Sequence, residues 1–222
     1  MALLASLALV LALPTVSTPP PGAGPLTTLR DDNSRIEAIL RRRPAPDSPQ
    51  ERAAKEELKG IVNNLLDYRE LAQRSLAEQW DKLSNAQREE FVATLRELIE
   101  KNYVKQLRTN LDYAVNYKSE RITAGQATVS TSVHVRTKGK STDVTIDYKM
   151  KRDEGRWKVW DVIDDEVSMV QNYRSQFAKI ISTDGYNALL ARMRKKISEI
   201  NEVQPNGGAA GGVMDSEHSP RQ

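Results

Sequence analysis

Few residues of this 222-residue chain have the types and spacing that catalysis or metal binding requires. The chain contains no cysteine, which excludes disulfides, thiolate metal sites and cysteine nucleophiles. His134 alternates with apolar residues and is expected on a solvated strand face, and His218 lies in the C-terminal tail. Neither histidine has neighbours at the spacing of a metal motif such as H-E-x-x-H. We therefore predict no metal site and no cofactor.

Asp161 is the strongest candidate for acid–base chemistry, because it interrupts an apolar stretch. At the mouth of a pocket, a buried carboxylate would have a raised pKa and could act as a general acid or base. The alternative is a structural role, in which Asp161 accepts hydrogen bonds or pairs with a cation such as Arg174. Residues 139–142 imitate the end of a phosphate-binding loop but lack its upstream glycine. We favour the structural role and predict that the chain is not an enzyme.

The charge balance does not indicate a nucleic-acid-binding protein. With 33 basic and 30 acidic residues, the formal charge is only +3. The segment 118–158 is locally basic, with ten Lys/Arg against five Asp/Glu. Such a bias is typical of a solvated face, and it could also dock an acidic partner or anionic head groups.

The N-terminal residues have the pattern of an export signal. Residues 2–13 are small and apolar, and residues 15–17 have the small-x-small form that signal peptidase cleaves. The apolar run is too short for a membrane-spanning helix. We predict a cleaved signal peptide over 1–17, with a retained anchor as the alternative, a Pro/Gly-rich linker over 18–30, one domain over 31–202 and a disordered tail over 203–222.

Apolar residues recur at helical spacing in several parts of the chain. Ser84 with Gln87, and Ser168 with Gln171, form capping boxes that should each start a helix. We expect helices over about 31–42, 51–83, 85–109 and 168–182, and a last helix that carries residues 189–197.

Between these helices the period of the pattern changes from 3.6 to 2. Alternation predicts strands over 127–135, 142–150 and 157–163, with a less regular one over 115–122. Short turns join them, so we expect an antiparallel meander. The predicted fold class is α+β, with a four-stranded or slightly larger antiparallel curved sheet packed by long helices. Periodicity does not separate a filled core from a hollow one.

Four motifs occur in a fixed order within about residues 30–200. They are Y-R-E-L-A-Q-R-S-L at 68–76, V-T-I-D-Y at 144–148, W-K-V-W-D-V at 157–162 and N-Y-R-S-Q-F at 172–177. Together they resemble the MlaC (toluene-tolerance) family of periplasmic phospholipid-binding proteins. Ala77 departs from that pattern, since the family usually has glycine at this position.

This resemblance implies a periplasmic carrier that shuttles phospholipid between the two membranes of a Gram-negative envelope and maintains outer-membrane lipid asymmetry. The implied partners are the phospholipid ligand, an inner-membrane ABC transporter with an MCE-domain ring, and an outer-membrane lipoprotein–porin complex. We expect a monomer that does not bind nucleic acid.

In the family, acyl chains enter a deep apolar pocket between the helices and the sheet. The resemblance therefore implies that large apolar residues of the two central helices and of the sheet contact lipid. Hinge-like points at Gly125, Gly155 and Gly185 could let such a pocket open. The candidate lipid-binding residues are Leu95, Leu98, Ile99, Tyr103, Val133, Val144, Ile146, Tyr148, Val170, Tyr173 and Phe177.

Two alternatives stay open at this point. The first is an enzyme on a cone-shaped fold like that of ketosteroid isomerase, with Asp161 as its base in a small closed cavity. The second is a ligand-free envelope adaptor, in which the apolar stripes are solid core and the basic face of the sheet binds a partner.

Overall fold

The computed structural model describes residues 22–106, 112–137 and 140–202. This part of the chain is α+β, as predicted, with a five-stranded antiparallel sheet in the order β1-β2-β3-β4-β5. The helices are α1 (Pro25–Arg41), α2 (Pro49–Leu65), α3 (Tyr68–Leu76), the 3₁₀ helix η1 (Ala77–Lys82), α4 (Asn85–Gln106), α5 (Met169–Asp184) and α6 (Tyr186–Glu202). The strands are β1 (Asp112–Thr123), β2 (Gln126–Thr137), β3 (Lys140–Asp153), β4 (Arg156–Asp164) and β5 (Val167–Ser168).

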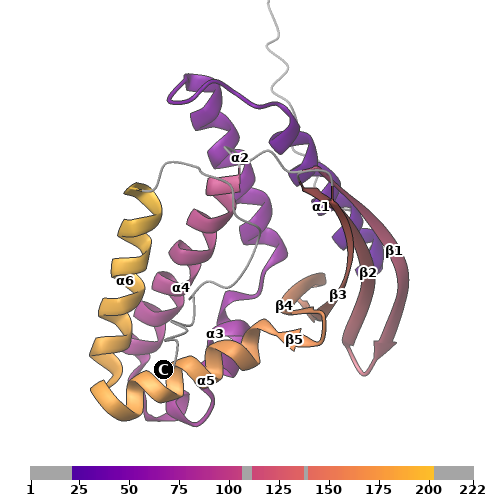
Figure 1. The fold of residues 1–222 in the computed structure, drawn as a ribbon. Helices are drawn as coiled ribbons and strands as arrows, with labels where there is room; N and C mark the ends of the chain where they lie inside the picture. The colour runs from indigo at the N-terminus through magenta and orange to yellow at the C-terminus, as the bar shows by residue number, and fades with distance from the viewer. Residues whose placement is uncertain (1–21, 107–111, 138–139, 203–222) are drawn as a thin grey trace, which may run out of the picture.

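The predicted meander is confirmed, including its less regular first strand. Strands β1 to β4 are antiparallel neighbours, and the two-residue β5 is an addition that the alternation did not predict. Irregularities in pairing at 117–119 of β1 and at 149–150 of β3 bend and twist the strands. The sheet is strongly curved, and helices α2 and α4 face its concave side (Figure 1).

Helix α1 begins earlier than predicted, so residues 25–30 are helical and do not belong to a linker. Pro25 has the fixed φ that suits a first helical position. The Leu26 N–H donates to the Glu120 carboxylate of β1 at 2.9 Å, and Leu29 is fully buried. A distant strand thus stabilises the start of this helix, and local sequence does not reveal such a contact.

The helix predicted over 51–83 is interrupted twice. The second interruption follows Leu76, where Ala77 has a φ of 49° and begins the 3₁₀ helix η1, and the first lies at residues 66 and 67. Leu66 is extended and forms a parallel bridge with Val159 of β4, where the Asp67 N–H donates to the Val159 carbonyl at 2.8 Å. The Asp67 side chain then accepts from the Glu70 N–H and caps α3. Pairing with the sheet therefore overrides the helical period here.

Both predicted capping positions start helices. Ser84 and Gln87 exchange two side-chain hydrogen bonds, so the capping box of α4 is complete. Ser168 accepts from the Gln171 N–H at 3.0 Å and caps α5. The predictions for 1–17 and 203–222, and the end of the helix predicted over 85–109, lie outside the described residues. None of the described helices has the length and apolar character needed to cross a membrane.

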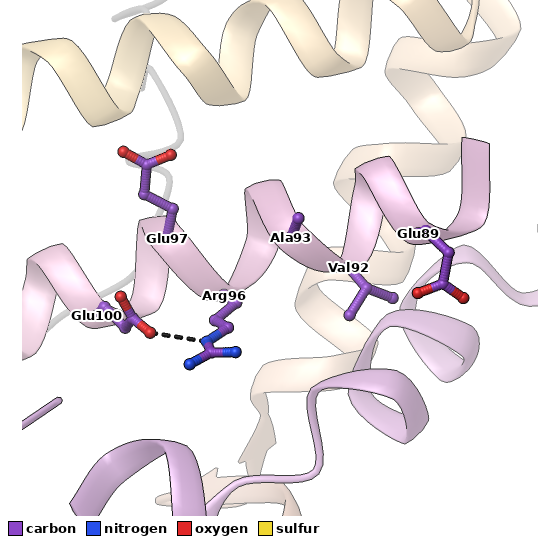
Figure 2. A pocket seen from close by; sticks show the side chains of 6 residues that line it. All are labelled: Glu89, Val92, Ala93, Arg96, Glu97 and Glu100. Atoms are coloured by element: carbon purple, nitrogen blue, oxygen red, sulfur yellow. Dashed lines mark hydrogen bonds and ion pairs between the residues drawn. The ribbon is translucent and has the colours of Figure 1, made fainter. Parts of the chain in front are cut away.

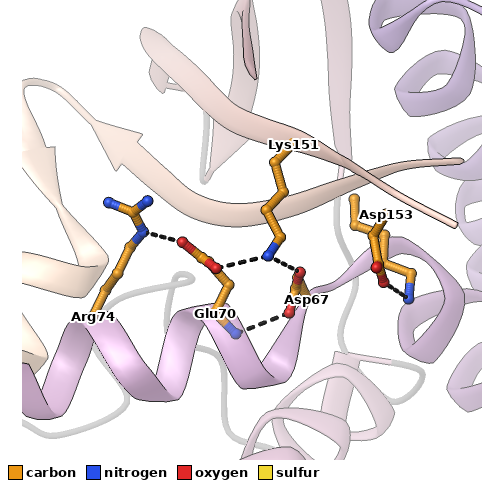
Figure 3. A network of polar contacts seen from close by, with 6 residues as sticks. Asp67, Glu70, Arg74, Lys151 and Asp153 are labelled. Carbon is orange, nitrogen blue, oxygen red and sulfur yellow. Dashed lines mark hydrogen bonds and ion pairs between the residues drawn. The ribbon is translucent and has the colours of Figure 1, made fainter. Parts of the chain in front are cut away.

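A polar network joins α3 to the sheet (Figure 3). Lys151 of β3 contacts Asp67 at 3.1 Å and Glu70 at 2.7 Å, and Glu70 also pairs with Arg74 at 2.6 Å. Although burial alone raises the pKa of Glu70, hydrogen bonds from Lys151 and Arg74 hold it below its ordinary value. The network holds α3 against β3.

Lys151→Met should destabilise the fold by about 1–2 kcal/mol, because it leaves two largely buried carboxylates without this cation. The effect should be largest near neutral pH. It should shrink as the pH falls through the lowered pKa of Glu70, because protonation removes the charge that Lys151 stabilises. Urea unfolding at several pH values measures this. Lys149→Met is the control, since Lys149 donates only to the neutral Thr128 hydroxyl; equal losses in both variants would contradict the role of the network.

Candidate functional site

On the concave face of the sheet, side chains are fully buried at one end of the strands and partly accessible at the other. Near the β1–β2 turn, Val129 of β2 and Met150 of β3 are fully buried. Towards the β2–β3 turn, Val133 is 9% exposed, while Val144 and Ile146 are half-buried. Apolar side chains on this face are therefore sealed at one end and partly accessible at the other. We call the partly accessible surface of Val133, Val144 and Ile146 the trough.

The predicted site residues fall into two groups. Tyr103 of α4 is half-buried, as are the sheet residues Val144, Ile146 and Tyr148, and Val133 of β2 belongs with them because it pairs with Val144. The others belong to a packed core between α4 and α5, where Phe177 meets Phe91 edge-on at 5.6 Å. Those fully or almost fully buried residues are Leu95, Leu98, Ile99, Val170, Tyr173 and Phe177.

Three residues at the concave face were not among the predicted site residues. Val115 and Tyr117 of β1 are half-buried between exposed neighbours and pair with Val133 and Thr131 of β2. Asn33 of α1 donates to the Tyr117 hydroxyl at 3.2 Å. The alternation of β1 marked the first two, whereas nothing local to α1 indicated that Asn33 reaches the sheet.

Asp161 has a structural role. One carboxylate oxygen accepts from the Ser168 hydroxyl at 2.6 Å and the other from the Val170 N–H at 3.0 Å, and the side chain is 4% exposed. Arg174, the partner suggested by the sequence, pairs instead with Glu78. Asp161 thus anchors the start of α5 to β4, with both oxygens occupied.

Asp161→Ala should cost about 2–4 kcal/mol of stability, because it leaves the buried Ser168 hydroxyl and Val170 amide without an acceptor. Asp161→Asn should cost less, since one acceptor oxygen remains. Denaturant unfolding of both variants tests this. Wild-type stability in Asp161→Ala would contradict the anchoring role.

The outer face of the sheet is polar and carries ion pairs. His134 lies 2.9 Å from Asp143 and is partly exposed, in agreement with the predicted solvated position. Lys158 pairs with Asp153 at 2.7 Å. Gly125 and Gly155 occupy hairpin turns at positive φ, and Gly185 ends α5. The partial exposure of His134 favours a solvated face at this position.

A surface groove of about 440 Å³ runs along α4 (Figure 2). Arg96 and Glu100, one turn apart on α4, pair at 2.8 Å. Its lining is mostly charged, so the groove does not suit acyl chains, which need apolar walls. The lining residues are Glu89, Val92, Ala93, Arg96, Glu97 and Glu100.

Comparison with known proteins decides the family. The model of the family described as MlaC protein matches residues 33–195, most of the chain. The chain belongs to the MlaC family. The expectation drawn from the motifs is therefore confirmed.

Two known proteins are similar to this chain. The intermembrane phospholipid transport system binding protein MlaC of Haemophilus influenzae is 25% identical over 144 residues, which cover 63% of this chain and 67% of that protein. A phospholipid-binding protein from Ralstonia solanacearum, solved in complex with a phospholipid, superposes with a TM-score of 0.63. It is 19% identical, and the match covers 81% of this chain and 99% of that one, so it supports the fold alone.

Proposed function

We propose that this protein is a soluble periplasmic carrier that moves phospholipid between the inner and outer membranes. The observation that carries the proposal is the family match across residues 33–195. The trough on the concave face supports it, because half-buried apolar residues such as Val144 and Ile146 offer a surface for acyl chains. Asp161 supports no enzymatic alternative, since both of its oxygens hold α5.

The energetics fit a carrier that uses no nucleotide of its own. Two acyl chains of about fifteen methylenes each, at about 0.8 kcal/mol per methylene, represent roughly 25 kcal/mol of transfer from water. Moving from a bilayer into a dry trough is therefore nearly neutral, whereas free diffusion through water is prohibitive. Any energy input would come from a membrane partner.

We assign the acyl-chain contacts to the accessible group of residues. Val133, Val144, Ile146 and Tyr148 would form the sheet side, and Tyr103 the side of α4. The six buried residues of α4 and α5 would form the packed wall behind them. This assignment makes the sheet residues the sensitive positions.

The proposed partners follow from the same family. They are an inner-membrane ABC transporter with an MCE-domain ring and an outer-membrane lipoprotein–porin complex, reached after removal of a signal peptide over 1–17. Such a carrier would maintain the lipid asymmetry of the outer membrane.

Extraction of phospholipid from vesicles tests the proposal. Delipidated protein is incubated with phospholipid vesicles, the vesicles are removed by centrifugation, and lipid phosphate is measured in the supernatant. We expect protein-dependent phospholipid that saturates as vesicles are added. Folded protein that extracts none would contradict the carrier and favour the ligand-free adaptor.

A further inference from the structure

Several polar side chains lie near one another at the middle of the otherwise apolar concave face. Thr131 of β2 pairs with Tyr117 of β1, and Tyr148 of β3 lies opposite Val129, one step along the same face. Asn33 of α1 reaches these side chains and donates to the Tyr117 hydroxyl at 3.2 Å. The group lies between the sealed end of the concave face and the trough.

This group is rich in hydrogen-bond donors. Because Asn33 donates to the Tyr117 oxygen, the Tyr117 O–H is left to donate elsewhere, and the Thr131 hydroxyl donates to the Ile146 carbonyl at 3.1 Å. Burial raises the pKa of Tyr117 and of Tyr148. The neighbouring Tyr103 and Tyr117 raise the pKa of Tyr148 further, and hydrogen bonds with Asn33 and Thr131 lower it by less. The phenols therefore stay protonated and act as donors at any physiological pH.

A ligand that matches this arrangement has apolar chains next to hydrogen-bond acceptors. The ester region of a glycerophospholipid has this chemistry, because its carbonyl oxygens accept hydrogen bonds and donate none. Hydrogen bonds are stronger in apolar surroundings than in water, so donors on this apolar face would favour such a ligand.

We propose that the hydroxyls of Tyr117 and Tyr148 form a donor site for the ester carbonyl oxygens of the bound phospholipid, with Asn33 orienting Tyr117. This inference rests on the proposed carrier function. It makes these residues determinants of lipid class: the protein distinguishes ester-linked from ether-linked lipids through the tyrosine hydroxyls.

A competition between two lipids tests the site. Delipidated protein is incubated with vesicles containing equal amounts of diester and diether phosphatidylglycerol with the same chain lengths, and the bound lipids are extracted and quantified by mass spectrometry. We expect wild type to prefer the diester lipid about 3- to 10-fold. Tyr117→Phe/Tyr148→Phe should remove most of this preference while still binding lipid, because the phenyl rings keep the apolar contacts.

Tyr186→Phe is the matched control, since the Tyr186 hydroxyl donates to the Gln87 carbonyl between α6 and α4, away from the sheet. This variant should keep the wild-type preference. Equal binding of both lipids by wild type would overturn the donor site and leave the carrier function intact, as would an unchanged preference in the double variant. If neither lipid binds to folded wild type, the carrier function itself fails.

Discussion

Replacing Val144 or Ile146 with tryptophan is expected to empty the trough of lipid while the protein still folds. Both residues are half-buried on the concave face, where a larger side chain has room to enter the ligand space. An indole there would take the place of about four or five lipid methylenes. At about 0.8 kcal/mol each, their loss lowers affinity by roughly 200- to 900-fold. Phospholipid bound per folded chain, measured after extraction, checks this result.

Thr145→Trp is the matched control for these variants. Thr145 lies on the same strand between the two positions but is exposed on the opposite face. It should keep wild-type lipid content and a wild-type circular dichroism spectrum. Full lipid content in Val144→Trp and Ile146→Trp would show that the ligand lies elsewhere.

Phe177→Ala should have the second large effect, on stability more than on lipid content. Phe177 is 1% exposed, stacks on Tyr173 at 5.3 Å and meets Phe91 edge-on. Truncating a buried phenylalanine in such a core costs about 3–5 kcal/mol, because the cavity that it leaves does not collapse fully. Urea unfolding monitored by tryptophan fluorescence measures the loss.

Phe177→Leu separates loss of volume from loss of the ring. It fills most of the space, so the expected cost is about 1–1.5 kcal/mol. Lipid per folded chain should change little in either variant, since Phe177 belongs to the packed wall. A stable Phe177→Ala with greatly reduced lipid would mean that Phe177 contacts ligand directly and is not core.

The sequence predicted those elements whose signals are local. Alternation in β2 and β3 places Val133 and Val144 on the concave face, and the box at Ser84 starts α4. It did not predict the break at Leu66 or the start of α1 at Pro25. These features depend on Val159 and Glu120, which lie far away in the chain.

The site was harder to predict than the fold. A helical or strand period indicates that a residue is buried, but it does not indicate whether protein or ligand covers that residue. Leu95 and Phe177 match the same pattern as Tyr103, yet the first two are sealed in the core and Tyr103 is half-buried. Asn33 carries no signal at all, since a single asparagine on a helix is ordinary. The group of polar side chains beside the trough can therefore be recognised only in the three-dimensional structure.

Native mass spectrometry of the protein purified from a bacterial envelope, without detergent or added lipid, tests the central claim most directly. The carrier account predicts a mass excess corresponding to about one phospholipid per chain, released on denaturation and absent from Val144→Trp. Well-folded wild-type protein that carries no phospholipid would contradict the account.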